Sequence, residues 1–203
     1  MKLPIDPDTV KGFLDPTEGA RLYELASEGA ALGPCLEVGS YCGKSTIYLA
    51  AACAEVGEQV FAVDHHRGSE EHQLGEEYHD SSLYDSQAEK LDTFPEFRRN
   101  LDRAGLSDSV VPIVAGTQAA GRHWRTALGM VFIDGGHSEA AALRDYRTWA
   151  PHLVPGGILA IHDIFPDPED GGQAPHHIYQ LALASGLFEP LPMVKTLGAL
   201  KRL

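Results

Sequence analysis

Acidic and histidine side chains follow two short apolar runs of the sequence, in positions that could support metal binding and proton transfer. Asp134 and His137 follow one run, and His162 and Asp163 follow the other. Carboxylates and an imidazole can hold a divalent ion such as Mg²⁺ or Mn²⁺, with water or substrate oxygens at the remaining positions. We therefore expect these residues to act together if the two runs end at the same place in the fold.

A glycine-rich segment follows another apolar run and has features of a nucleoside-binding loop. Residues 37–43 read EVGSYCG, a helical pattern follows, and Asp64 stands at the end of the next apolar run. The dinucleotide fingerprint needs a middle glycine where the backbone approaches a pyrophosphate, but Tyr41 occupies that place. Glu37 would repel a pyrophosphate but suits an ammonium or sulfonium group, and Asp64 can accept hydrogen bonds from both hydroxyls of a ribose. An adenosine with a cationic amino-acid tail and no phosphate meets these conditions, and S-adenosylmethionine is that molecule.

Five apolar runs and the helical patterns around them define the fold that must position these residues. The runs are continuous rather than alternating, as expected for parallel strands whose two faces are covered by helices. We predict an α/β fold, a single Rossmann-like, doubly wound domain over residues 1–203, mostly parallel and with a terminal antiparallel hairpin. Because the carboxyl ends of parallel strands meet at one edge, the chemical groups above should line one crevice. Strands are expected at 35–38, 60–63, 110–114, 130–133 and 157–161, the hairpin near 187–191 and 196–202, and helices near 16–29, 43–52, 93–105, 117–127, 138–151 and 175–184.

The first helix begins with a recognisable capping sequence. Asp15 is expected to be the N-cap and Pro16 the first helical residue, and Glu18 could close a capping box with the N-cap backbone. This helix and the terminal strands could also supply the surface of a homodimer.

The segment 65–90 interrupts the strand and helix pattern. It is polar, rich in Glu and His, and too long for an ordinary connection between a strand and a helix. It leaves a strand beside the predicted crevice, so it is either a lid over the active site or a solvated surface excursion. His65, which directly follows Asp64, could contact the adenosine, whereas the other histidines of the segment match no structural zinc spacing.

The composition excludes several kinds of partner. The chain has 16 Lys and Arg against 29 Asp and Glu, a formal net charge of -13, and no basic stripe that could neutralise the phosphates of a nucleic acid. It has no apolar stretch of about 18 residues and no signal-peptide core, so we expect no membrane partner and predict a cytoplasmic protein. Cys35, Cys42 and Cys53 show no CxxC spacing and are expected to be free thiols.

From Cys35 through Leu203 the sequence resembles the class I S-adenosylmethionine-dependent methyltransferases. Their first motif matches Glu37-x-Gly39-x-x-x-Gly43, and their acidic ribose ligand matches Asp64. The resemblance implies that Gly39 and its neighbours pass beneath the methionine part of the cofactor, while residues after the third strand flank its adenine. The implied cofactor-binding residues are Glu37, Gly39, Ser40, Tyr41, Gly43, Asp64, His65, Gly116, Thr117 and Asp134.

The groups after the fourth and fifth strands resemble those of the metal-dependent O-methyltransferases, which include catechol and sugar-directed macrolide methyltransferases. This resemblance implies that Asp134, His162 and Asp163 bind the metal and that His137 takes the proton of the acceptor. His162 stands where these families usually have an acid, and an imidazole ligand shifts the preference from Mg²⁺ toward Mn²⁺, iron or zinc. The implied activity is methyl transfer to a hydroxyl group of a small-molecule substrate, with divalent metal assistance.

Other interpretations of the same residues remain open. The fold also serves metal-independent methyltransferases that act on nitrogen or carbon, and non-catalytic modules that bind S-adenosylmethionine. A nicotinamide-dependent oxidoreductase is disfavoured by the residues of the glycine-rich segment. In the plainest interpretation Gly39 and Gly43 are turn glycines, His137 belongs to a helix start, and His162 and Asp163 form a hydrogen-bonded strand end.

Overall fold

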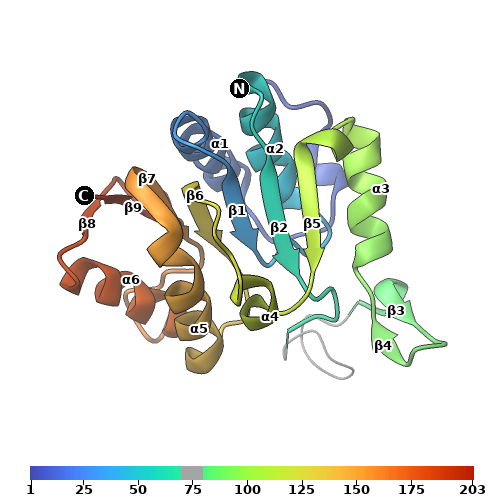
Figure 1. Ribbon diagram of the computed structural model, residues 1–203. Helices are drawn as coiled ribbons and strands as arrows, with labels where there is room; N and C mark the ends of the chain where they lie inside the picture. The colour runs from blue at the N-terminus through green and yellow to red at the C-terminus, as the bar shows by residue number, and fades with distance from the viewer. Residues whose placement is uncertain (70–79) are drawn as a thin grey trace.

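A computed structural model describes residues 1–69 and 80–203 and places most strands in one central sheet (Figure 1). The parallel strands are β1 (Cys35–Val38), β2 (Val60–Asp64), β5 (Val110–Val114), β6 (Leu128–Ile133) and β7 (Leu153–Ile161), and the chain ends in the hairpin of β8 (Phe188–Pro190) and β9 (Gly198–Arg202). Their order is β5-β2-β1-β6-β7-β9-β8, and β9 is antiparallel to both of its neighbours. The predicted doubly wound sheet with a terminal antiparallel hairpin is confirmed.

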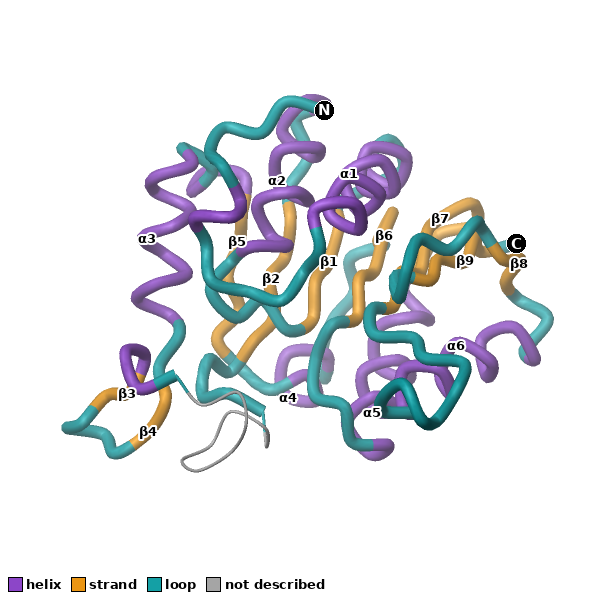
Figure 2. The backbone as a smooth tube through the Cα atoms, turned by 180° about the vertical axis from the view of Figure 1, so that it is seen from behind, coloured by secondary structure: helices purple, strands orange, loops and turns teal. Residues whose placement is uncertain are grey.

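Helices cover both faces of the sheet because each strand presents alternate apolar residues to opposite sides. In β6, Met130 and Phe132 join the core on one face, whereas Val131 and Ile133 join the core on the other. The first core is covered by α1 (Pro16–Ala30), α2 (Lys44–Val56) and α3 (Phe94–Ala104), and the second by α4 (Thr117–Gly121), α5 (Glu139–Trp149) and α6 (Ala174–Ala184), as Figure 2 shows from behind. Short 3₁₀ helices lie at Pro7–Thr9, Ser81–Leu83, Ser107–Ser109 and Ala150–His152.

Helix α4 is shorter than the sequence pattern predicted, because it ends at Gly121 rather than near residue 127. Residues 122–127 are mostly exposed and therefore lack an apolar face that could hold a longer helix against the sheet. The ring of Trp124 instead packs against Phe61 and Trp149, with ring centroids 4.9 Å and 5.2 Å away. The chain thus leaves the helical path after Gly121, before β6 begins.

The described part of the segment 65–90 contains a small antiparallel hairpin that the sequence did not predict. Its strands, β3 (Tyr84–Asp85) and β4 (Lys90–Leu91), lie near one end of α3 and apart from the main sheet (Figure 1). Leu83 and Leu91 are buried in one cluster with Cys42 and pack against Tyr41. Tyr41 and Cys42 lie in the loop after β1. Residues 70–79 of the predicted lid lie outside the described residues, so the lid stays a prediction.

The strand order reverses between β1 and β6, which is where sheets of this kind bind ligands. The backbones that follow these two strands approach each other closely. A Cβ atom on Gly39 would lie 2.0 Å from the carbonyl oxygen of Asp134, and Gly39 has a φ of +90°. Glycine is therefore required at position 39 both by the contact and by the left-handed conformation.

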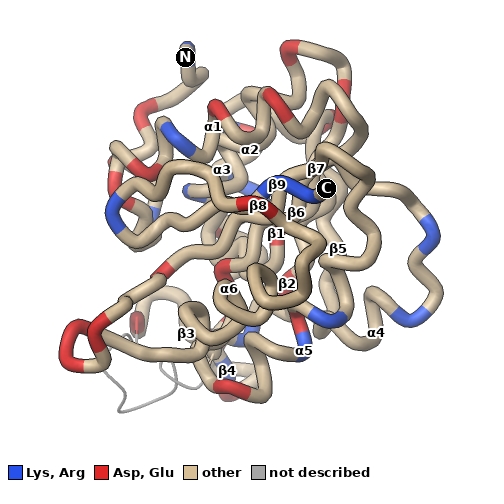
Figure 3. The backbone as a smooth tube through the Cα atoms, turned by 90° about the vertical axis from the view of Figure 1, so that its left-hand side faces the viewer, with Lys and Arg blue, Asp and Glu red and all other residues tan. Residues whose placement is uncertain are grey.

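Charged residues are distributed along the whole described chain. Figure 3 shows Asp and Glu in many separate stretches, with Lys and Arg in short stretches between them. Across residues 1–69 and 80–203, no helix combines the length and the apolar character needed to cross a membrane. The three cysteines are free, as predicted, and all three are buried.

Candidate active site

Two adjoining cavities open at the carboxyl ends of the parallel strands. The first has a volume of about 570 Å³ and is bordered by the ends of β1, β2 and β6, the start of α4 and one side of α5. The second has a volume of about 540 Å³ and lies between residues 11–14, the loop after β1 and the loop after β7. Both cavities are bordered by Gly39, Tyr41, Ser69, Asp134, Gly135 and His137. They meet at the reversal of the strand order, so a group bound in one could react with a group bound in the other.

The first cavity collects most of the residues predicted to bind a cofactor. Ser40 borders only the second cavity. Gly43 is the N-cap of α2 with a φ of +93°, so its role in the fold is that of a turn glycine. The predicted residues on the border of the first cavity are Gly39, Tyr41, Asp64, His65, Gly116, Thr117 and Asp134.

The Asp64 carboxylate is fixed by two backbone N–H groups. Its Oδ2 accepts a hydrogen bond from the Tyr41 N–H at 2.8 Å, and its Oδ1 accepts one from the His66 N–H at 2.8 Å. Tyr41 and His66 both have positive φ angles, 45° and 56°, which aim these groups at the carboxylate. Each carboxylate oxygen can accept a further hydrogen bond, so Asp64 can also receive two hydroxyl groups of a ligand.

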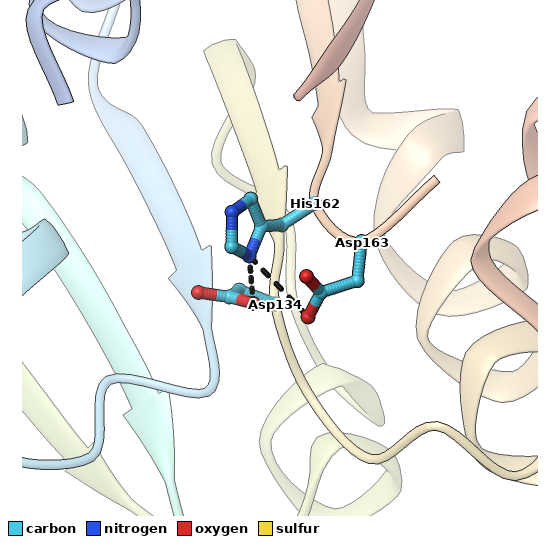
Figure 4. A group of neighbouring side chains, drawn as sticks. All are labelled: Asp134, His162 and Asp163. Carbon is cyan, nitrogen blue, oxygen red and sulfur yellow. Dashed lines mark hydrogen bonds and ion pairs between the residues drawn. The ribbon is translucent and has the colours of Figure 1, made fainter. Parts of the chain in front are cut away.

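Asp134, His162 and Asp163 converge at the ends of β6 and β7 (Figure 4). The His162 Nδ1 lies 3.1 Å from an Asp134 carboxylate oxygen and 3.4 Å from one of Asp163. One ligand atom of each residue lies within 4.8 Å of the others, and His162 is buried while the two acids are partly exposed. Two carboxylates and one imidazole nitrogen form a donor set that suits a divalent metal ion.

The electrostatics of this group require positive charge at its centre. Burial would lower the pKa of His162, but the carboxylates of Asp134, Asp163 and Glu18 raise that pKa far above its usual value. Burial would likewise raise the pKa of Asp163, but hydrogen bonds from His137 and His162 hold it well below its usual range. The cluster therefore needs either a proton on both nitrogens of His162 or a bound cation.

His137 joins this cluster to both cavities. Its Nε2 lies 3.1 Å from Oδ2 of Asp163, and its side chain is one third exposed. An acid that accepts a hydrogen bond from a histidine orients the ring and stabilises the imidazolium that forms when the ring takes up a proton. The predicted base and the predicted metal ligands thus form one connected group.

Comparison with known proteins identifies the fold family. A family model described as a methyltransferase domain matches residues 36–164, which contain the glycine-rich segment and the whole Asp134, His162 and Asp163 cluster. The chain belongs to this methyltransferase family. The resemblance inferred from the sequence is therefore confirmed.

Solved structures share the fold of this methyltransferase at low sequence identity. The cofactor-bound protein Rv0187 from MTB is 18% identical, with a TM-score of 0.68 over 97% of this chain and 85% of that chain. An O-methyltransferase from Bacillus cereus in complex with SAH is 18% identical, with a TM-score of 0.63 over 94% of this chain and 83% of that chain. The O-methyltransferase TomG from Streptomyces achromogenes in complex with SAM is 17% identical, with a TM-score of 0.62 over 94% and 81% of the two chains.

Glu37 of this methyltransferase does not approach either cavity, contrary to the expectation that it faces a cationic ligand. It is fully buried, and its two carboxyl oxygens accept hydrogen bonds from the hydroxyls of Ser45 and Thr46, each at 2.5 Å. Burial raises its pKa to about 8 despite these hydrogen bonds, so the carboxyl group is largely neutral at pH 7. Glu37 ties the start of α2 to the end of β1.

Glu18 does not close a capping box and reaches the cluster instead. Asp15 caps α1 as predicted, accepting a hydrogen bond from the Thr17 N–H at 2.8 Å. Glu18 is only 3% exposed, and its Oε2 lies 3.0 Å from Nε2 of His162. Helical periodicity could have indicated this position, because Glu18 precedes the buried Leu22 by four residues.

The sequence interpretation also missed Asp145, which borders the first cavity from α5. It is buried, and burial raises its pKa to about 6, against the lowering effect of the Thr117 hydroxyl. Asp145 lies three residues after Ala142 and four before Trp149, both buried. The same helical periodicity therefore marks it as an acid on the buried face.

Proposed function

We propose that this methyltransferase transfers the methyl group of S-adenosylmethionine to a hydroxyl group of a small-molecule substrate, with a divalent metal ion at Asp134, His162 and Asp163. The observation that carries the proposal is the position of His137, which borders both cavities and lies 3.1 Å from Asp163. A base between a donor cavity and an acceptor cavity is what proton removal during methyl transfer needs.

The first cavity is the proposed site of the methyl donor. Asp64 would accept the ribose hydroxyls there, and the backbone after Gly39 would lie beneath the methionine part. S-adenosylmethionine supplies a methyl group on a positively charged sulfur, which is already a good leaving group. The protein then contributes mainly by positioning donor and acceptor. The related structures described as SAM or SAH complexes support this assignment.

The second cavity is the proposed site of the acceptor. The residues that would hold a metal, Asp134, His162 and Asp163, border it together with His137. A divalent ion held there would make an acceptor hydroxyl more acidic. His137 would take the proton of that hydroxyl, and Asp163 would stabilise the imidazolium that results. The imidazole ligand favours Mn²⁺ over Mg²⁺.

A metal-independent methyltransferase is the second candidate, because one observation favours it. The His162 Nδ1 is within hydrogen-bond distance of Asp134, so a doubly protonated His162 would also place a positive charge within the cluster. In that case His137 would act as a base without a metal, and acceptors with nitrogen or carbon nucleophiles would also be suitable.

The deciding experiment combines metal analysis with a methyl-transfer assay. Protein purified without chelator is assayed with S-adenosylmethionine against a panel of small alcohols, phenols and amines, before and after chelation. We expect turnover on hydroxyl acceptors that chelation removes and Mn²⁺ restores. Full turnover by metal-free protein would support the second candidate, and failure to bind S-adenosylmethionine would overturn both.

A further inference from the structure

We infer that Glu18 is a positioning residue that determines which nitrogen of His162 faces the metal site. The inference rests on the proposed function, because it concerns His162 as a metal ligand. Glu18 comes from α1, near the start of the chain, and its Oε2 lies 3.0 Å from the His162 Nε2 on the side opposite the cluster. The Nδ1 of the same ring faces Asp134 and Asp163.

Glu18 is itself held in one orientation. Its Oε1 accepts hydrogen bonds from the Thr196 N–H at 2.8 Å and from the Thr196 hydroxyl at 2.7 Å. The neighbouring Lys195 forms an ion pair with Asp15, which caps the same helix. Only Oε2 is thus directed at His162, and the carboxylate cannot turn away without losing two hydrogen bonds.

This arrangement selects one form of the imidazole. When the His162 ring is neutral, a carboxylate beside Nε2 favours a proton on that nitrogen, which leaves the lone pair on Nδ1. A lone pair that faces carboxylate oxygens at 3.1 Å and 3.4 Å is unfavourable unless a cation lies among them. Glu18 would therefore prepare His162 to bind a metal through Nδ1, and α1 would be part of the active site.

The test compares metal binding with donor binding in matched variants. Glu18→Ala removes the carboxylate, and Glu18→Gln keeps the shape but offers either an oxygen or an NH₂ group to Nε2. Glu24→Gln is the control, because Glu24 lies on the same helix, is exposed and pairs only with Arg21 among the contacts of the described chain. Mn²⁺ affinity is measured by electron paramagnetic resonance, S-adenosylmethionine affinity by calorimetry, and stability by thermal unfolding.

We expect Glu18→Ala to weaken Mn²⁺ binding about 10- to 100-fold, as is typical when the partner of a metal-binding histidine is lost. Glu18→Gln should show a smaller loss, and S-adenosylmethionine affinity should stay within about twofold in both variants. Thr196→Val, which removes only one donor to Glu18, is a milder variant if Glu18→Ala does not fold, and it should weaken Mn²⁺ binding with the same selectivity.

Three results would overturn the inference. Unchanged Mn²⁺ affinity in the Glu18 variants would do so while leaving the proposed metal site intact. Parallel loss of Mn²⁺ and S-adenosylmethionine affinity would assign Glu18 to general stability. A wild-type protein that binds S-adenosylmethionine but not Mn²⁺ would overturn both the inference and the metal part of the proposed function.

Discussion

Nε2 of His137 lies 3.1 Å from Oδ2 of Asp163, so the proposed base is oriented by a residue of the proposed metal site. Proton removal and metal binding are therefore linked through one carboxylate, whose pKa is held well below its usual range by His137 and His162 despite burial. The Asp163 backbone has a φ of 57°, a conformation that aspartate and asparagine tolerate better than most residues.

Replacement of His137 tests the base directly. We expect His137→Ala to lower kcat by about 100- to 10,000-fold, the usual contribution of a general base, with little change in S-adenosylmethionine affinity. His123→Ala is the matched control, because His123 is exposed and borders neither cavity. A kcat within a few-fold of wild type would remove His137 from the mechanism. Steady-state kinetics and calorimetry on the same preparations separate the two effects.

Replacement of Asp64 tests the donor site. Hydrogen bonds to a charged group are worth about 1.5–3 kcal/mol each, so Asp64→Ala should weaken S-adenosylmethionine binding by at least about tenfold. The substitution also removes the acceptor of the Tyr41 and His66 N–H groups, and the resulting local disorder would add to this effect. Asp108→Asn serves as the control, since Asp108 is exposed and lies outside both cavities. Equal Kd values for wild type and Asp64→Ala in calorimetry would contradict the assignment.

Replacement of Gly39 tests the close approach of the backbones after β1 and β6. A methyl group at position 39 would meet the Asp134 carbonyl oxygen at 2.0 Å, so Gly39→Ala should destabilise the fold by about 2 kcal/mol or more. Gly105→Ala is the control for backbone strain alone, because Gly105 also has a positive φ but nothing lies within 4 Å of its added Cβ. Urea unfolding should show a clearly larger loss for Gly39→Ala. Equal losses would mean that strain alone accounts for both.

The sequence was informative where a signal is local. Continuous apolar runs predicted the parallel strands, and the residues directly after those runs could be placed at one edge because parallel strands end together. Asp134, His162 and Asp163 were predicted to meet for this reason, and they do. Gly39 was also recognised, although its requirement arises from contact with Asp134, which only the fold reveals.

The sequence was misleading where a local rule competed with a distant contact. Glu18 fits a capping box by spacing, yet its carboxylate hydrogen-bonds to His162 and Thr196, which lie far along the chain. Glu37 suggested a charged ligand contact, yet the hydroxyls of Ser45 and Thr46 bind it within the core. Residue type and spacing do not distinguish these outcomes, because both depend on which buried partner the fold supplies.

The buried Glu37 predicts an unusual dependence of stability on pH. Burial raises the folded-state pKa of Glu37 from an ordinary value of 4.5 to about 8. Between these two pH values the folded protein therefore retains a proton that the unfolded chain has released. The contribution of Glu37 to stability is therefore fully present below about pH 4.5 and is lost as the pH rises through about 8.

Glu37→Gln cannot ionise and retains hydrogen-bonding capacity toward Ser45 and Thr46. Urea unfolding from pH 5 to pH 8.5 should show wild-type stability falling relative to Glu37→Gln, by at most about 1.4 kcal/mol per pH unit. Parallel curves for the two proteins would show that Glu37 is ionised in the fold, and Glu24→Gln should run parallel to wild type throughout.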